Sequence, residues 1–197
     1  MRFSVLSPVS RILAALLLLS GPALAQTTGE QLFVPPPSGW TIVHSANEDG
    51  VETTGLSPQG QTAENWSDML AVAVTQGAPK KAPQDVLKDK LTEIEAACDS
   101  VGAGPVGIAQ ENGYDTAMRA IACPRTKTLG KGEISLIKAM NGKERSYLII
   151  RAWRGPAFEK DQMPLPAETT KQWLTFMNRV VLCDSRNPAR HPCPKTR

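Results

Sequence analysis

Residues 133–153 read EISLIKAMNGKERSYLIIRAW, and no other stretch of the chain indicates a fold so clearly. Glu133–Met140 and Ser146–Trp153 are rich in the aliphatic, β-branched and aromatic residues that favour strands. Between these runs, Asn141-Gly142 is the strongest short hairpin signal that a sequence offers. The stretch therefore predicts two antiparallel strands joined by a turn over residues 141–144.

More strands are predicted upstream of this hairpin. Tyr114–Cys123 is a further strand-like run. Nearer the N-terminus, Gly39–Ala46 alternates between two faces and Val51–Leu56 returns after the turn signal Asn47-Glu48-Asp49-Gly50, which predicts a second hairpin. Met69–Thr75 is continuously apolar, as expected of a central strand that is buried on both faces.

Two segments show helical periodicity. Pro83–Cys98 begins with a proline, which suits a first helical turn, and Gly102 and Gly104 follow it as stop signals. The second predicted helix covers Ala167–Val181. Apolar residues recur on one face of each segment. They are Leu87, Leu91, Ile94 and Cys98 in the first helix, and Trp173, Met177, Val180 and Val181 in the second.

The predicted order of elements is β-β-β-α-β-β-β-α, which indicates the α+β class. We expect an antiparallel sheet of about six strands with two main helices packed on it. Helices on one face would give two layers, and helices on opposite faces would give an α/β/α arrangement. We assign residues 27–38, which include Pro35-Pro36-Pro37, to an extended lead-in. Residues 39–182 form the single predicted domain, and residues 183–197 a disulfide-clipped tail.

Residues 1–26 have the pattern of a signal peptide. Arg2 and Arg11 precede or begin a short apolar run, Ile12–Leu19, and Ala23-Leu24-Ala25 supplies a small-residue cleavage pattern. Eight apolar residues span about 12 Å as a helix, whereas the hydrocarbon core of a bilayer is about 30 Å thick. We therefore predict cleavage near Ala25-Gln26, a periplasmic or secreted protein, and no integral membrane span.

The charge balance excludes several classes of partner. The chain of 197 residues has 22 Lys and Arg against 19 Asp and Glu, a net charge of +3. Cleavage would remove Arg2 and Arg11 and no acidic residue, which lowers this charge by two. A nearly neutral protein is not expected to bind nucleic acid. Only 2 His are present and the cysteine spacings match no standard zinc pattern, so we predict no metal site.

The four cysteines are expected to form disulfides, because an even number in an exported protein favours pairing. Spacing alone leaves three pairings open. Cys183 and Cys193 flank a proline-rich tail, which a bridge would clip to the body of the protein. Cys98 ends the apolar stripe of the first helix and Cys123 ends a strand, so their sulfurs could meet between helix and sheet. We predict the pairs Cys98–Cys123 and Cys183–Cys193.

Several segments, together with the order of elements, resemble the PsbP-like α/β/α superfamily, and within it a set of uncharacterised exported proteins of proteobacteria. The resemblance would cover about residues 32–195. It implies a binding or assembly module and carries no catalytic residues with it. The segments are Pro35-Pro36-Pro37-Ser38-Gly39-Trp40, residues 60–70 (GQTAENWSDML), Val181-Leu182-Cys183-Asp184-Ser185-Arg186 and His191-Pro192-Cys193-Pro194.

Arg151-Ala152-Trp153-Arg154 is the most distinctive short motif. Strand alternation places Arg151 on one face with Trp153, where an arginine beside an aromatic ring can form a cation–π contact or bind an anion. The alternative is an arginine at the end of the sheet that pairs with a helix carboxylate. Trp66 is expected to close the sheet edge. We take Trp66, Arg151 and Trp153 as a candidate binding surface.

No local motif of a hydrolase, phosphate-binding loop or metalloprotease is present. We therefore predict no catalytic, cofactor-binding or metal-binding residues, and a non-enzymatic module that binds an envelope protein or a small ligand. The alternative interpretation is a small periplasmic hydrolase with a site near His44, Arg151 and Trp153. This alternative requires the three side chains to line one concave pocket.

Overall fold

The computed structural model describes residues 29–195, so the predicted signal peptide lies outside the described residues. Its main sheet has eight strands, in the order β2-β3-β4-β9-β8-β7-β5, with β6 also paired to β7. The strands are β2 (Trp40–Glu48), β3 (Val51–Pro58), β4 (Asp68–Gln76), β5 (Gly102–Ala103), β6 (Gly107–Glu111), β7 (Tyr114–Cys123), β8 (Lys131–Asn141) and β9 (Arg145–Pro156). A separate two-stranded sheet pairs β1 (Glu30–Phe33) with β10 (Val181–Asp184).

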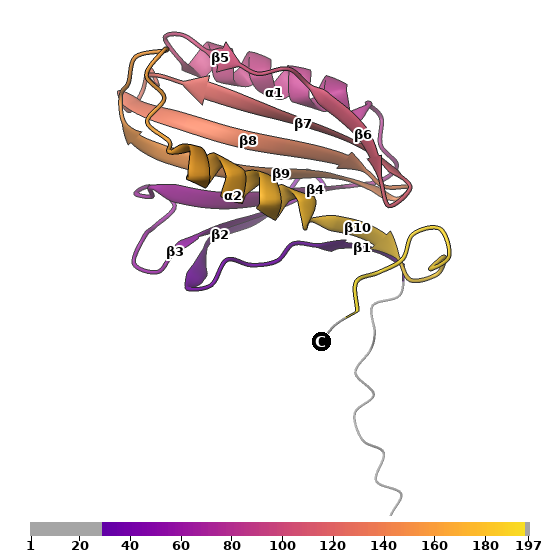
Figure 1. The fold of residues 1–197 in the computed structure, drawn as a ribbon. Helices are drawn as coiled ribbons and strands as arrows, with labels where there is room; N and C mark the ends of the chain where they lie inside the picture. The colour runs from indigo at the N-terminus through magenta and orange to yellow at the C-terminus, as the bar shows by residue number, and fades with distance from the viewer. Residues whose placement is uncertain (1–28, 196–197) are drawn as a thin grey trace, which may run out of the picture.

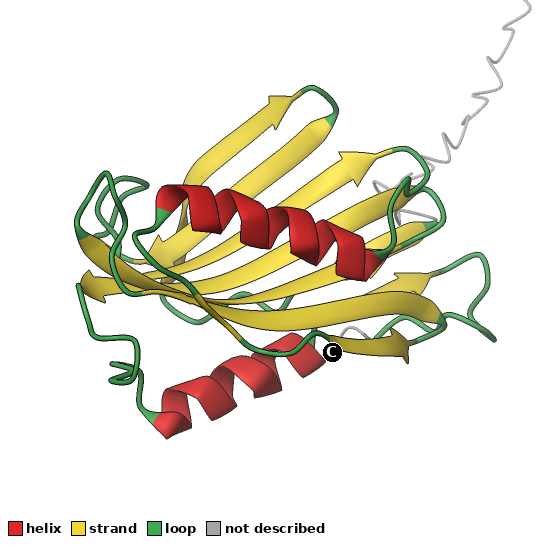
Figure 2. Cartoon of the chain, turned by 90° about the horizontal axis from the view of Figure 1, so that it is seen from above, coloured by secondary structure: helices red, strands yellow, loops and turns green. Residues whose placement is uncertain are grey.

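Two helices, α1 (Pro83–Ala97) and α2 (Ala167–Asn178), lie on opposite faces of the main sheet (Figures 1 and 2). The neighbouring strands pair antiparallel throughout. The predicted α+β class is therefore confirmed, with an α/β/α layering and more strands than the six expected. Among the described residues, no helix has both the length and the apolar character needed to cross a membrane.

Helix α1 covers only part of its face of the sheet. It begins at Pro83, as predicted, and Leu87 is fully buried on its apolar stripe. The stripe packs against β7 and β8, where Ile121 and Ile137 are also buried. The strands β2, β3 and β4 lie beyond the helix. Strand β4 was predicted to be buried on both faces, and this is wrong on the α1 side, where Ala71 and Ala73 line an open groove.

Helix α2 covers the opposite face. Trp173 and Met177 are buried in a core that it shares with β4, β8 and β9. The helix ends at Asn178, earlier than the predicted end at Val181. Two contacts explain the difference. The buried Lys138 ammonium donates to the Met177 carbonyl at 2.9 Å, and Val181 leaves the helix to pair with Phe33 of β1.

Tight turns set the register of two hairpins. Asp49-Gly50 closes β2–β3 and Asn112-Gly113 closes β6–β7, with positive φ at all four residues, from 51° to 79°. This is the backbone that two-residue hairpin loops require. The hairpin predicted from Asn141-Gly142 is also present, as β8–β9. Its loop is three residues long, and Gly142 does not adopt a positive φ.

Both disulfides join the cysteines that the sequence pairs. Cys98 bonds to Cys123 with the Cα atoms 5.8 Å apart, and Cys183 bonds to Cys193 at 5.0 Å. Within the predicted tail, Cys183 and His191 are almost fully buried. Within the predicted lead-in, residues 30–33 form β1.

Candidate ligand-binding site

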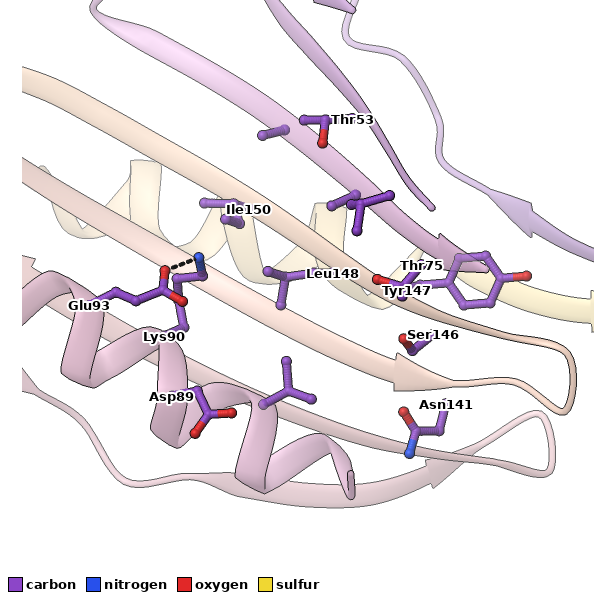
Figure 3. Close-up of a pocket in the computed structure, with 14 residues that line it drawn as sticks. Thr53, Thr75, Asp89, Lys90, Glu93, Asn141, Ser146, Tyr147, Leu148 and Ile150 are labelled. Carbon is purple, nitrogen blue, oxygen red and sulfur yellow. Dashed lines mark hydrogen bonds and ion pairs between the residues drawn. The ribbon is translucent and has the colours of Figure 1, made fainter. Parts of the chain in front are cut away.

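Two of the hollows in the described part of the chain lie on opposite faces of the sheet. The hollow on the α1 side is a groove of about 510 Å³ over β3, β4 and β9 (Figure 3). Its floor consists of small and aliphatic side chains, among them Thr53, Leu148 and Ile150. Along its rim, charged side chains of α1 already pair with one another or with a neighbouring lysine, as in Lys90 with Glu93 and Lys81 with Asp89. This groove exists because α1 stops short of β4.

The hollow on the α2 side has a different character. It has a volume of about 410 Å³ and lies between the proline-rich segment, the start of β4, the middle of β9, and helix α2. We call it the Arg151 pocket. Its lining residues are Pro35, Pro36, Pro37, Ser38, Asp68, Arg151, Thr169, Gln172, Trp173, Phe176 and Arg179.

Arg151 reaches this pocket from the middle of the sheet. Side chains alternate along β9, so Arg151 shares the α2 face with Ile149 and Trp153. Its cross-strand partners are Leu70 on β4 and Leu136 on β8, both buried. Arg151 is thus an arginine at a core position, and only 9% of it is exposed.

Three aromatic rings surround the Arg151 guanidinium. Its central carbon lies 4.4 Å from the ring centre of Trp40, 5.4 Å from that of Trp173 and 5.6 Å from that of Phe176. Trp40 begins β2, and the other two rings come from α2. These distances are within the range of cation–π attraction. The rings present π faces to the cation and supply no carboxylate or carbonyl oxygen.

The guanidinium lacks a complete set of hydrogen bonds. The Nη1 atom of Arg151 is buried and has no hydrogen-bond partner among the described residues. Asp68 is the nearby acid, but the two side chains form no ion pair within 4 Å. Burial lowers the pKa of Arg151, and the charge of Asp68 opposes that shift only in part. A buried charge without a partner is costly, and such groups concentrate at functional sites.

Arg154 shows what a satisfied arginine looks like on the same strand. It lies on the opposite face of β9, 3.9 Å from the ring centre of Trp66. Its Nε donates to the Glu133 carboxylate at 2.7 Å. Arg154 therefore has both an aromatic and an anionic partner, whereas Arg151 has the aromatic partners alone.

The structure brings together only part of the predicted binding surface. Arg151 and Trp153 share a face, but Trp153 packs against Phe158, with ring centres 6.2 Å apart, and does not line the pocket. Trp66 is buried beneath Arg154 and lies with it on the other face. The predicted alternative of an Arg151–carboxylate ion pair is not observed among the described residues.

The hydrolase interpretation is wrong in its geometry. Residues paired directly across neighbouring strands share a face of the sheet. His44 on β2 is connected in this way, through Gly55 and Ala71, to Ile150, which lies on the α1 side, so His44 points to the α1 side as well. Arg151 points to the other side, and two strands separate β2 from β9. His44 is also exposed. The proposed constellation of His44, Arg151 and Trp153 therefore does not line one pocket.

Sequence reasoning identified Arg151 but missed most of its surroundings. Trp40, Trp173 and Phe176 were placed in a strand and a helix without being connected to Arg151, and Asp68 and Arg179 were not singled out. One signal was available: a charged residue at an inward position of an apolar strand needs a partner. Among residues 29–195, no group of three or more His, Cys, Asp or Glu side chains could hold a metal ion.

No family model matches the chain, and no curated protein matches it. Among solved structures, the chain is similar to the solution structure of cyanobacterial PsbP (CyanoP) from Synechocystis sp. PCC 6803. The sequence identity is 12% and the TM-score 0.43, over 80% of this chain and 94% of that chain. The similarity concerns the fold in outline, and no ligand, partner or residue role follows from it.

Proposed function

We propose that this protein is a non-enzymatic binding module whose ligand occupies the Arg151 pocket. One observation carries the proposal: Arg151 is a buried cation, its Nη1 has no partner, and it lines an open hollow of about 410 Å³. A ligand that accepts hydrogen bonds there would supply the missing partner. A concave site with a few convergent polar groups among apolar walls is typical of small-ligand binding.

The pocket is assembled from segments that lie far apart in the chain. Residues 35–38, the start of β4, the middle of β9 and helix α2 all contribute side chains. A ligand seated there would contact all four segments and would stabilise the folded chain by mass action. Ligand binding is therefore expected to raise the unfolding temperature.

The test of this proposal is a thermal-unfolding screen of the purified chain against small organic acids, bases, sugars and peptides. A ligand of any of these classes should raise the unfolding temperature of the wild type and of Arg154→Met. The same ligand should not change the unfolding temperature of Arg151→Met, because that variant keeps the apolar volume of the side chain and loses its hydrogen-bond donors. A screen without hits, or hits that act equally on Arg151→Met, would refute the proposed function.

We also propose that the protein acts in the periplasm or outside the cell, on a small ligand or an envelope protein. Residues 1–26 would be removed, leaving the lead-in 27–38, the domain 39–182 and the tail 183–197. The two disulfides support this location, since oxidising compartments favour them. The sequence resemblance to exported proteins of proteobacteria supports it as well.

Fractionation of cells that express a C-terminally tagged chain tests the location. The expected result is a periplasmic or secreted protein whose N-terminus, read by mass spectrometry, lies near Gln26. Intact Met1 in the cytosolic fraction, together with four thiols that react with an alkylating reagent, would contradict the proposal.

A further inference from the structure

We propose that the Arg151 pocket recognises a monocarboxylate attached to an apolar body. The inference rests on the proposed function, and it adds the chemical class of the ligand. Three properties of the pocket lead to this class: the incompletely hydrogen-bonded guanidinium, the balance of charge, and the nature of the walls.

The first property is the way the guanidinium is held. The guanidinium carbon of Arg151 lies 4.4 Å from the ring centre of Trp40, and the ring centres of Trp173 and Phe176 lie within 5.6 Å of it. These rings attract the cation but offer its N–H donors no carboxylate or carbonyl oxygen. The buried Nη1 has no acceptor, and Arg151 lines the pocket. A carboxylate would satisfy this cation, because it can accept two parallel hydrogen bonds from one arginine.

The second property is the balance of charge. The charged side chains that line the pocket are two arginines, Arg151 and Arg179, and one acid, Asp68. Asp68 pairs across the strands with Trp153, which places it one diagonal step from Arg151 on the same face. One negative charge on the ligand would neutralise the excess. A dianion such as phosphate would bring a second negative charge close to Asp68, which is unfavourable in a partly desolvated site.

The third property is the apolar wall. Pro35, Pro36 and Pro37 form one side of the pocket, and Trp173 and Phe176 form another. Consecutive prolines are stiff, so this wall does not have to be ordered when a ligand binds. A ligand with a branched aliphatic or aromatic body would bury its apolar surface between these walls. Inorganic anions have no such surface and would gain nothing from them.

Two sources can supply this chemistry: a free organic acid, or the C-terminal carboxylate of a peptide that ends in an apolar residue. Calorimetric titration of the full chain distinguishes them with four probes. These are 3-phenylpropionate, its amide, the peptide Gly-Gly-Phe with a free C-terminus, and the same peptide with a C-terminal amide. Inorganic phosphate serves as the dianion.

We expect at least one of the two acids, 3-phenylpropionate or Gly-Gly-Phe, to bind. The amide of that acid should bind at least about tenfold more weakly, because it cannot form a charge-assisted pair with the arginine. Whichever acid binds more tightly identifies the source. Arg151→Met should remove the difference between acid and amide. Arg154→Met should retain it, since Arg154 is on the other face of β9. Phosphate should bind more weakly than the better acid.

The inference is overturned if acid and amide bind equally, if Arg151→Met retains the preference for the acid, or if phosphate binds more tightly than both acids. Failure of all the probes to bind also overturns it. None of these results decides whether the pocket binds a ligand of another class, which the thermal-unfolding screen tests separately. A neutral or cationic ligand that depends on Arg151 in that screen would support the function and refute the carboxylate.

Discussion

The carboxylate of Glu30 occupies the space that a side chain on Gly142 would need. Glu30 belongs to β1, and Gly142 follows β8 in the loop before β9. The carboxylate accepts a hydrogen bond from the Lys143 amide at 2.6 Å and another from the Tyr147 hydroxyl at 2.9 Å. Burial, reinforced by the Glu30 charge, raises the pKa of Tyr147. The glycine of this hairpin thus makes room for β1 rather than allowing a left-handed turn.

Gly142→Ala is therefore expected to lower the free energy of unfolding by about 1–3 kcal/mol, the cost of displacing a buried carboxylate from its donors. Urea denaturation measures the change. Gly107→Ala is the control, because a Cβ there would be 3.8 Å from its nearest neighbour, an ordinary contact. Equal stability of the two variants would show that Glu30 moves away at no cost.

Arg151→Met is expected to raise the free energy of unfolding by about 1 kcal/mol in the absence of ligand, because it removes a buried charge whose Nη1 has no acceptor. Arg154→Met is expected to lower it, since Glu133 then loses its partner. Chemical denaturation of both variants at neutral pH is the measurement. A loss of stability in Arg151→Met would mean that the three aromatic contacts outweigh the cost of burial.

Removing either disulfide should destabilise the protein by a similar amount. Chain entropy alone assigns roughly 3.5 kcal/mol to Cys98–Cys123 and roughly 2.8 kcal/mol to Cys183–Cys193. The shorter loop also holds His191, whose Nδ1 lies 2.8 Å from the Asn112 carbonyl oxygen and whose ring lies 4.3 Å from that of Tyr114. The free energy of those contacts, which is lost with the bridge, offsets the smaller entropic contribution of the shorter loop.

Paired Cys→Ser variants of each bridge, compared by urea denaturation, test this equality. A loss for the tail bridge that is smaller than that for Cys98–Cys123 by more than about 1 kcal/mol would show that His191 keeps its place without the bridge.

Asp184 should make stability depend on pH in the acid range. Hydrogen bonds from Arg186, at 2.8 and 2.9 Å, hold the pKa of Asp184 at about 2, below its ordinary value of 3.8. A lowered pKa in the folded state contributes stability above the unfolded pKa, and this contribution is lost as pH falls toward 2.

The free energies of unfolding of the wild type and Asp184→Asn should therefore differ at pH 7 and converge between about pH 4 and pH 2. Denaturation curves at several pH values provide the measurement. A difference that stays constant across this interval would show that Arg186 does not hold the ionised carboxylate.

The long elements could be predicted because their periodicity agrees with their burial. Helix α1 begins at the predicted proline, and β8 and β9 pair around the predicted turn. The short strands could not be predicted in this way. Strand β6 is five residues long and mostly exposed, and β1 is four residues long. The partner of β1 is β10, at the other end of the described chain, so pairing rather than local pattern determines β1. Strand β6 pairs with the adjacent β7 across the Asn112-Gly113 turn, but its exposed residues show no buried alternation.

The candidate site could be predicted only to the extent of one residue. Arg151 is visible as a charge within an apolar strand, but its surroundings depend on the layering of the sheet. Trp40 precedes it by more than a hundred positions, and Trp173 follows on a helix whose side of the sheet the sequence left open. The sequence could likewise not show that the ring of Trp66 contacts Arg154 rather than Arg151. Trp66 precedes β4, and only the pairing of β4 with β9 brings it to the face of the sheet that carries Arg154.

The pairing of β1 with β10 joins the first strand of the described chain to the last. During synthesis β1 leaves the ribosome before any other described element, yet its partner is made only after α2. Contacts between such distant segments carry a high entropic cost of loop closure and form late in folding. Until then, the backbone of β1 has no strand partner, and only neighbours such as Lys143 and Tyr147, which contact Glu30, are already made. The first strand to be made is thus among the last to find its place.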